Sequence, residues 1–202
     1  MNNLATLKTI GRPCFTVEDV ARSLGISRPS AWVFCNRKVR SGEFLRARRN
    51  LYVFVDGFAD CGDRELFAIS NLIQTPSYVS YATALSYYGL TSQILPSTVE
   101  AQNPVRMKTY PVGKVVFRYH FCRKEFYFGF VRMDGFFIAE PEKALLDSLY
   151  LSFLGRYRLD ETALDLKSVR WAVLDKWIRR YPDRIQSSYK EWRRGRENLT
   201  AA

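Results

Sequence analysis

The chain has 202 residues, 47% hydrophobic and 25% charged, a composition typical of a folded globular protein and unlike that of a disordered one. Lysine and arginine outnumber aspartate and glutamate by 31 to 20, so the formal net charge is +11. Such a surplus indicates an anionic partner, namely nucleic acid, a membrane surface or an acidic protein. No apolar run approaches the ~20 residues of a membrane-spanning helix, and the N-terminal residues lack the apolar segment of a signal peptide.

Cysteine and histidine usage excludes the common metal sites. The four cysteines stand at positions 14, 35, 61 and 122 with no C-x-x-C pair, and the chain has one histidine. We therefore expect reduced thiols, no metal, no cofactor, no membrane association and a cytoplasmic location.

The basic surplus lies toward both ends of the chain. Residues 1–60 carry a net charge of +5, residues 61–160 of +2 and residues 161–202 of +4. A stretch rich in glycine and aspartate, residues 56–63, separates an apolar run from a helical pattern. We therefore predict two domains, residues 1–60 and 61–202.

Two helices joined by a short turn are predicted near the N-terminus. Thr16 can cap the first, Asp19 adds negative charge to its first turn, and Gly25 ends it. Ser27 can cap a second helix over residues 28–41, with Pro29 in its first turn. This order is typical of a helix-turn-helix.

The second helix has two different faces at 100° per residue. Ala31, Phe34, Cys35 and Val39 form a core-facing stripe. The residues that we predict to read a DNA major groove are Arg28, Ser30, Val33, Asn36, Arg37 and Arg40. Arginine can pair with guanine, asparagine with adenine, and an apolar side chain can touch a thymine methyl group. The alternative is an ordinary solvated helix face.

Two short β-prone stretches within residues 43–55 predict a wing after this helix. They flank a turn at Arg48, Arg49 and Asn50, and asparagine tolerates the positive φ that such a turn needs. We expect Arg46, Arg48, Arg49 and Asn50 to contact the DNA backbone. Winged helices also bind RNA and proteins.

The rest of the chain predicts an α+β fold, in which the winged helix-turn-helix precedes a mixed α/β domain with a small, mainly antiparallel sheet. Strands are expected at residues 115–121, 126–131 and 136–138. Helices are expected at residues 65–73, 80–90, 162–169 and 171–181, and another is opened by residues 140–142. The alternating aromatic side chains are Phe117, Tyr119, Phe121, Phe126, Phe128 and Phe130. They suit a buried sheet face, or alternatively a platform for stacking bases.

The tail over residues 176–196 carries eight basic and two acidic residues, with Tyr189 and Trp192 between them. It could follow a phosphate backbone, or it could be a solvated helix or a frayed end.

Catalysis is not expected. Glu140, Glu142 and Asp147 could bind a metal ion, but pairing with Lys143 and the helix dipole explains their charges. His120 and Cys122 would face the same way on a strand, without a recognisable third group to orient them. No nucleotide-binding or hydrolase motif is present.

Three segments together resemble the AbiEi-type antitoxins of type IV toxin–antitoxin systems. Residues 42–53 are similar to the family's G-x-L-x-R-x-x-x-G-x-Y run, with Phe44 in place of leucine and Asn50 in place of glycine. Residues 78–91 are similar to its "serine…alanine-leucine…glycine-leucine-threonine" helix, and residues 138–147 to its (E/D)-P-E-K-A-L-L-D helix.

The resemblance implies a DNA-binding antitoxin that represses its own operon through inverted repeats in the promoter. It also implies that the second domain counters a nucleotidyltransferase-like toxin, for which a stable complex is not required. Two alternatives stay open: a winged-helix regulator without a toxin, and an RNA-binding protein that uses the aromatic sheet and the basic tail.

Overall fold

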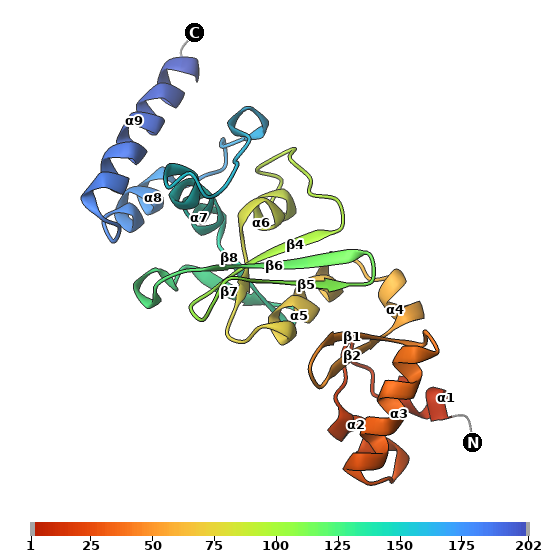
Figure 1. Cartoon of the computed structure of the whole chain (residues 1–202). Coiled ribbons are helices and arrows are strands. Elements are labelled where there is room, and N and C mark those ends of the chain that lie inside the picture. Colours follow the sequence, from red (N-terminus) through yellow and green to blue (C-terminus); the bar gives the residue numbers. More distant parts are fainter. Residues whose placement is uncertain (1–2, 201–202) are drawn as a thin grey trace.

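The computed structural model describes residues 3–200, and the side chains of residues 3–196. The N-terminal part forms one end of an elongated molecule (Figure 1). It comprises α1 (Asn3–Lys8), α2 (Val17–Leu24), α3 (Arg28–Arg40), β1 (Phe44–Arg48), β2 (Leu51–Phe54) and α4 (Val55–Ala59). The strands β1 and β2 pair antiparallel, and their sheet packs beside α3.

A six-stranded sheet occupies the middle of the molecule in the order β5-β6-β4-β3-β8-β7. Its strands are β3 (Tyr78–Val79), β4 (Thr98–Asn103), β5 (Lys108–Val112), β6 (Val115–Phe121), β7 (Phe130–Met133) and β8 (Phe136–Ala139). Three neighbouring pairs are antiparallel, whereas β4 with β6 and β3 with β8 are parallel. The α+β class is confirmed, with a larger and more mixed sheet than the strand pattern predicted.

Helices cover both faces of this sheet. In Figure 1, α5 (Asp63–Ile73) lies on one face, and α6 (Tyr81–Tyr87) and α7 (Pro141–Phe153) lie on the other. Beyond α7, the chain continues into α8 (Trp171–Ile178) and α9 (Asp183–Thr200), which form the end opposite the winged part. Short 3₁₀ turns occur at Lys124–Phe126 and Glu161–Ala163.

Two predicted elements differ from the fold, one in its bounds and one in its type. Residues 126–131 do not form one strand, because a 3₁₀ turn ends at Phe126 and Gly129 adopts φ 70° just before β7. Residues 162–169 form an irregular segment after a short 3₁₀ turn rather than a helix. Backbone contacts to the α6–β4 connection, Ser92 N–H to Ala163 O and Asp165 N–H to Leu90 O, replace the helical hydrogen bonds there.

The six alternating aromatic side chains do not share one face of a sheet, as the sequence suggested, but differ in burial. Phe117, Tyr119 and Phe126 are buried, whereas Phe121 is 46% exposed. Phe128 and Phe130 are partly buried and pack against the main core cluster. Most of this aromatic surface therefore belongs to the core, as in the first of the two interpretations.

Buried apolar residues form two clusters. The smaller one joins α1, α2, α3 and the wing sheet around Phe15, Phe34 and Phe44. The larger one fills the space between the six-stranded sheet and its helices, and it also receives Ala47 and Leu51 from the wing. Within residues 3–200, no helix is long and apolar enough to cross a membrane.

Candidate nucleic-acid interface

Local capping determines where α2 begins and ends. Asp19 N–H donates to Thr16 Oγ1 at 3.2 Å, and Thr16 N–H donates to Asp19 Oδ2 at 2.9 Å, which completes a capping box. At the other end, Gly25 adopts φ 64°, and Ile26 N–H donates to Ala21 O at 3.1 Å. The predicted helix and both of its boundary residues are thus present.

The helix α3 starts and packs as its sequence predicts. Ser27 Oγ accepts from Ser30 N–H at 3.3 Å, and Pro29 lies in the first turn, where its missing N–H costs no hydrogen bond. Ala31, Phe34 and Cys35 are buried in the smaller cluster, with Val39 half-buried beside them. This packing directs the opposite side of α3 away from the protein.

The outward side of α3 carries most of the predicted base-reading residues. Ser30, Val33, Arg37 and Arg40 are exposed, and Asn36 is half-buried. Arg37 lies 5.7 Å from the ring centre of Phe34 and, like Arg40, makes no ion pair with the carboxylates of the described residues. The helix therefore presents polar, cationic and apolar groups together.

Trp32 is a candidate DNA contact that the sequence did not assign to either predicted face of α3. Its side chain is 56% exposed, and the neighbouring Val33 is 60% exposed. Trp32 stands four residues before Asn36, so both lie along the same flank of α3. The sequence contained a signal for Trp32. It is a large apolar side chain that lies beside the core-facing stripe of α3 rather than in it, and no second helix covers it.

The wing is a tight antiparallel hairpin. Arg46 is opposite Tyr52, and Arg48 is opposite Leu51, with a bulge between Arg46 and Arg48. Asn50 adopts φ 59°, so the positive backbone angle expected at the turn is present. The hairpin holds Arg49 at its tip, exposed and without an ion-pair partner among the described carboxylates.

A side-chain contact joins the wing to α3. The guanidinium of Arg46 donates to Asn36 Oδ1 and also lies over the Tyr52 ring, 5.8 Å from its centre. Because the amide oxygen of Asn36 is engaged, its NH₂ group is the part left to donate to a base. The structure thus brings together a residue predicted to read bases and one predicted to contact the backbone.

Two wing residues also have contacts inside the protein. Asn50 Oδ1 accepts from Val17 N–H at 3.0 Å, and Asn50 Nδ2 donates to Glu18 Oε2 at 2.7 Å. Arg48 Nε donates to Leu72 O, on α5, at 3.3 Å. The side chain of Asn50 therefore holds the turn to the start of α2, and that of Arg48 joins the wing to the rest of the chain.

Two of the basic residues are neutralised by nearby acids. Arg28 pairs with Glu18 at 2.7 Å, and Lys38 pairs with Glu43 at 2.6 Å. Hydrogen bonds from Asn50, and then from Arg28, lower the pKa of Glu18 from its ordinary 4.5 to about 2. The net positive charge of this surface therefore rests on Arg37, Arg40, Arg46, Arg48 and Arg49.

The carboxylates of the α7 segment have structural partners. Arg170 pairs with Glu140 at 3.0 Å and with Glu142 at 2.8 Å. Asp147 accepts hydrogen bonds from Lys143, Tyr78 and Ser80. Among the described residues, no group of three or more histidine, cysteine or acidic side chains could hold a metal ion.

The sequence also pointed to His120 with Cys122 as a possible chemical pair. His120 Nε2 lies 3.3 Å from Glu100 Oε1, a partner that the sequence did not indicate. Burial raises the pKa of the Cys122 thiol to about 12, so the thiolate nucleophile is scarce at neutral pH.

The aromatic residues of the basic tail pack against the protein. Tyr189 is buried and donates to Asp175 Oδ1 at 2.9 Å, and Trp192 Nε1 donates to Glu161 Oε2 at 2.7 Å. Arg193 forms an ion pair with the same Asp175. The tail is therefore folded into the end of α8 and most of α9, with Tyr189 and Trp192 engaged in contacts within the protein.

Comparison with known proteins agrees with this geometry. The sequence model of a family described as "Transcriptional regulator, AbiEi antitoxin" matches residues 7–55, which run from α1 through the wing to the first residue of α4. No curated protein matches the chain. Over residues 7–55, about a quarter of the chain, the protein is thus similar to the AbiEi antitoxin family of transcriptional regulators.

Proposed function

We propose that this protein is a cytoplasmic, DNA-binding antitoxin that represses transcription of its own operon. The observation that carries the proposal is the continuous surface formed by α3 and the wing. Its outward groups are Ser30, Val33, Asn36, Arg37, Arg40, Arg46, Arg48 and Arg49, with Arg28 at the start of the helix. A helix of this kind reads base edges, while wing arginines neutralise phosphates.

The division into residues 1–60 and 61–202 is part of this proposal. Each part has its own sheet, which supports the division. The contact of β1 with β5 and the bond from Arg48 to Leu72 indicate that the two parts are nevertheless packed together.

We further propose a type IV system in which the second domain counters a nucleotidyltransferase-like toxin without requiring a stable complex. The family description of residues 7–55 supports the antitoxin role. The test is co-expression with a neighbouring toxin gene: growth is restored by the full chain, and restoration persists when Arg37 and Arg40 are both changed to alanine. Restoration that depends on these two residues would contradict a separate antitoxin domain.

The RNA-binding alternative has lost its main support. Phe117, Tyr119 and Phe126 are buried, and Tyr189 is buried in the tail, so few aromatic rings are free to stack on bases. Neither catalysis nor a cofactor is part of the proposed function.

Fluorescence anisotropy with the chain's own upstream region and a shuffled duplex, across a salt series, tests DNA binding. We expect tight binding to the upstream region, with an affinity that falls steeply as salt rises. Equal, weak binding to both duplexes would contradict sequence-specific repression. Preference for single-stranded RNA would favour the RNA-binding alternative.

A further inference from the structure

A cavity of about 520 Å³ is lined by residues of β4, β5, β6 and the segments before β4 and after α7, and by none of α3 or the wing. Its walls include Arg118 and His120 from β6, Thr109 from β5, and Arg156 and Arg158 from the segment after α7. Pairing of Arg118 with both Glu100 and Thr109 places these side chains next to one another across three strands. This volume falls within the range of small-molecule sites.

The rim of this cavity is cationic and largely unpaired. Arg156 and Arg158 are exposed, and their side chains make no hydrogen bond or ion pair with the side chains that the structure describes. Arg118 is 48% exposed, and its ion-pair partner is Glu100 at 3.7 Å. Three guanidinium groups therefore line one opening, with Glu100 beside Arg118 and Asp160 near Arg158.

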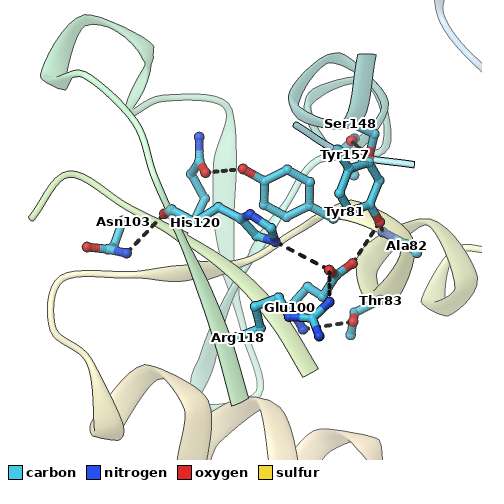
Figure 2. A network of polar contacts seen from close by, with 11 residues as sticks. Tyr81, Ala82, Thr83, Glu100, Asn103, Arg118, His120, Ser148 and Tyr157 are labelled. Carbon is cyan, nitrogen blue, oxygen red and sulfur yellow. Dashed lines mark hydrogen bonds and ion pairs between the residues drawn. The ribbon is translucent and has the colours of Figure 1, made fainter. Parts of the chain in front are cut away.

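The carboxylate of Glu100 is buried and also lines the cavity. Glu100 has no exposed surface; it accepts from Tyr157 Oη at 2.7 Å and lies 3.3 Å from His120 Nε2 (Figure 2). Tyr157 Oη in turn accepts from Ala82 N–H at 3.2 Å, which fixes the segment carrying Arg156 and Arg158 against α6. Glu100 thus positions the wall of the cavity and leaves the cationic side chains facing outward.

We propose that this cavity binds a mononucleotide. Guanidinium groups bind phosphate through paired, charge-assisted hydrogen bonds, for which Arg156 and Arg158 are available, with the half-exposed Arg118 beside them. Thr109 and Gln93 supply hydroxyl and amide groups for the ribose, and Leu95 and Met107 supply apolar surface for the base. A cavity of this volume, open to solvent on one side, suits a small ligand better than a nucleic-acid strand, which needs an extended groove.

Ligand binding in this cavity can be followed by NMR through the chain's only histidine. His120 lines the cavity and is the one imidazole in the sequence, so its NMR signals need no further assignment. We would titrate the full chain with AMP, GMP, UMP, ribose 5-phosphate and inorganic phosphate, following the His120 signals and the heat of binding. A saturable shift with at least one mononucleotide, at lower concentration than with the two base-free phosphates, is expected.

The test variant carries Arg156→Ala and Arg158→Ala together. The matched control variant carries Arg132→Ala and Lys124→Ala together. The control removes two exposed positive charges on the β7 side of the sheet. We expect the first pair to weaken mononucleotide binding at least about tenfold and the control to leave it unchanged. Thermal unfolding checks that both variants are folded.

Three results would overturn the proposal. The first is the absence of a saturable His120 shift with any mononucleotide. The second is an equal loss of binding in the control variant, which would mean general charge attraction. The third is a His120 response to RNA or DNA oligonucleotides alone, which would identify a strand-binding surface.

Discussion

Asn50, at the turn of the wing, donates a hydrogen bond from Nδ2 to Oε2 of Glu18, near the start of α2, at 2.7 Å. The two residues are 32 positions apart in the chain. Glu18 also binds Arg28 at the start of α3. One carboxylate thereby connects the wing with both helices of the helix-turn-helix, so the geometry of the proposed DNA surface depends on it.

Substitutions of Asn50 separate the role of its side chain, which makes hydrogen bonds to Val17 and Glu18, from the role of its backbone, which adopts a positive φ. Asn50→Gly loses the bonds to Val17 and Glu18 but accepts φ 59°, whereas Asn50→Ala loses the bonds and strains the backbone. We expect alanine to lower the free energy of unfolding by about 1–2 kcal/mol more than glycine does. Urea denaturation measures both, and equal losses would show that the backbone angle does not matter.

The hydrogen bonds that Glu18 accepts from Asn50, and then from Arg28, predict a specific dependence of stability on pH. Because its pKa in the folded protein is about 2, below the ordinary 4.5, ionised Glu18 contributes stability fully above about pH 4.5. That contribution is lost as pH falls from about 4.5 toward 2. In Glu18→Gln, unfolding free energy should therefore fall less steeply from pH 4.5 to 3, as measured by urea titrations at each pH. Parallel curves for both proteins would contradict this.

Asn36→Ala and Arg49→Ala should affect DNA binding differently. Loss of a base-reading amide should reduce discrimination between the upstream and shuffled duplexes by about 1–3 kcal/mol. Loss of Arg49, which has no carboxylate partner, should weaken binding to all duplexes and lower the salt slope by about one. Anisotropy titrations measure both effects, and identical losses on both duplexes for both variants would refute the assignment.

Trp32→Ala should impair DNA binding with little effect on folding. Its side chain is 56% exposed, so the free energy of unfolding should change by no more than about 0.5 kcal/mol. Affinity for the upstream duplex should fall by roughly 1 kcal/mol or more, because apolar area buried against DNA is lost. The control is Ile94→Ala, which removes a 72% exposed side chain outside α3. Unchanged affinity in Trp32→Ala would place Trp32 outside the interface.

Lys143→Met should destabilise the larger part of the protein. Lys143 and Asp147 have no exposed side-chain surface and form an ion pair, and Lys143 also donates to Tyr181 Oη at 3.2 Å. Removal of one buried partner leaves the other charge unpaired, at a cost of about 3–5 kcal/mol. Lys167→Met, at a 92% exposed lysine paired at 3.9 Å, is the control and should change stability by less than about 1 kcal/mol. A similar small change in Lys143→Met would contradict the importance of this pair.

Much of the candidate site could be predicted because its determinants are local. Thr16 with Asp19, Gly25 and Ser27 act on backbone groups within a few residues of themselves, so their capping roles follow from spacing alone. The contacts from Arg46 to Asn36 and from Asn50 to Glu18 could not be predicted, because they join segments separated by 10 and 32 positions.

The central strand β4, in contrast, could not be predicted from its sequence. Its sequence, Thr-Val-Glu-Ala-Gln-Asn, lacks the apolar alternation of a strand, yet Glu100, Gln102 and Asn103 are buried. Hydrogen bonds from Tyr157, Tyr81 and their neighbours make this burial possible. No pattern within the sequence of β4 indicates those hydrogen-bond partners, so neither the strand nor the cavity beside it was predicted.

By itself, the sequence determined the α+β class, the helix-turn-helix with its caps, the wing turn at Asn50 and the basic character of the α3 face. Tertiary structure decided the six-stranded order, the burial of Phe117, Tyr119 and Phe126, the irregular path of residues 162–169 and the network around Glu100. The physical reason is the range of the interactions. Caps and helix faces depend on neighbours within about one or two turns, whereas buried polar groups are stable only where distant segments supply their hydrogen-bond partners.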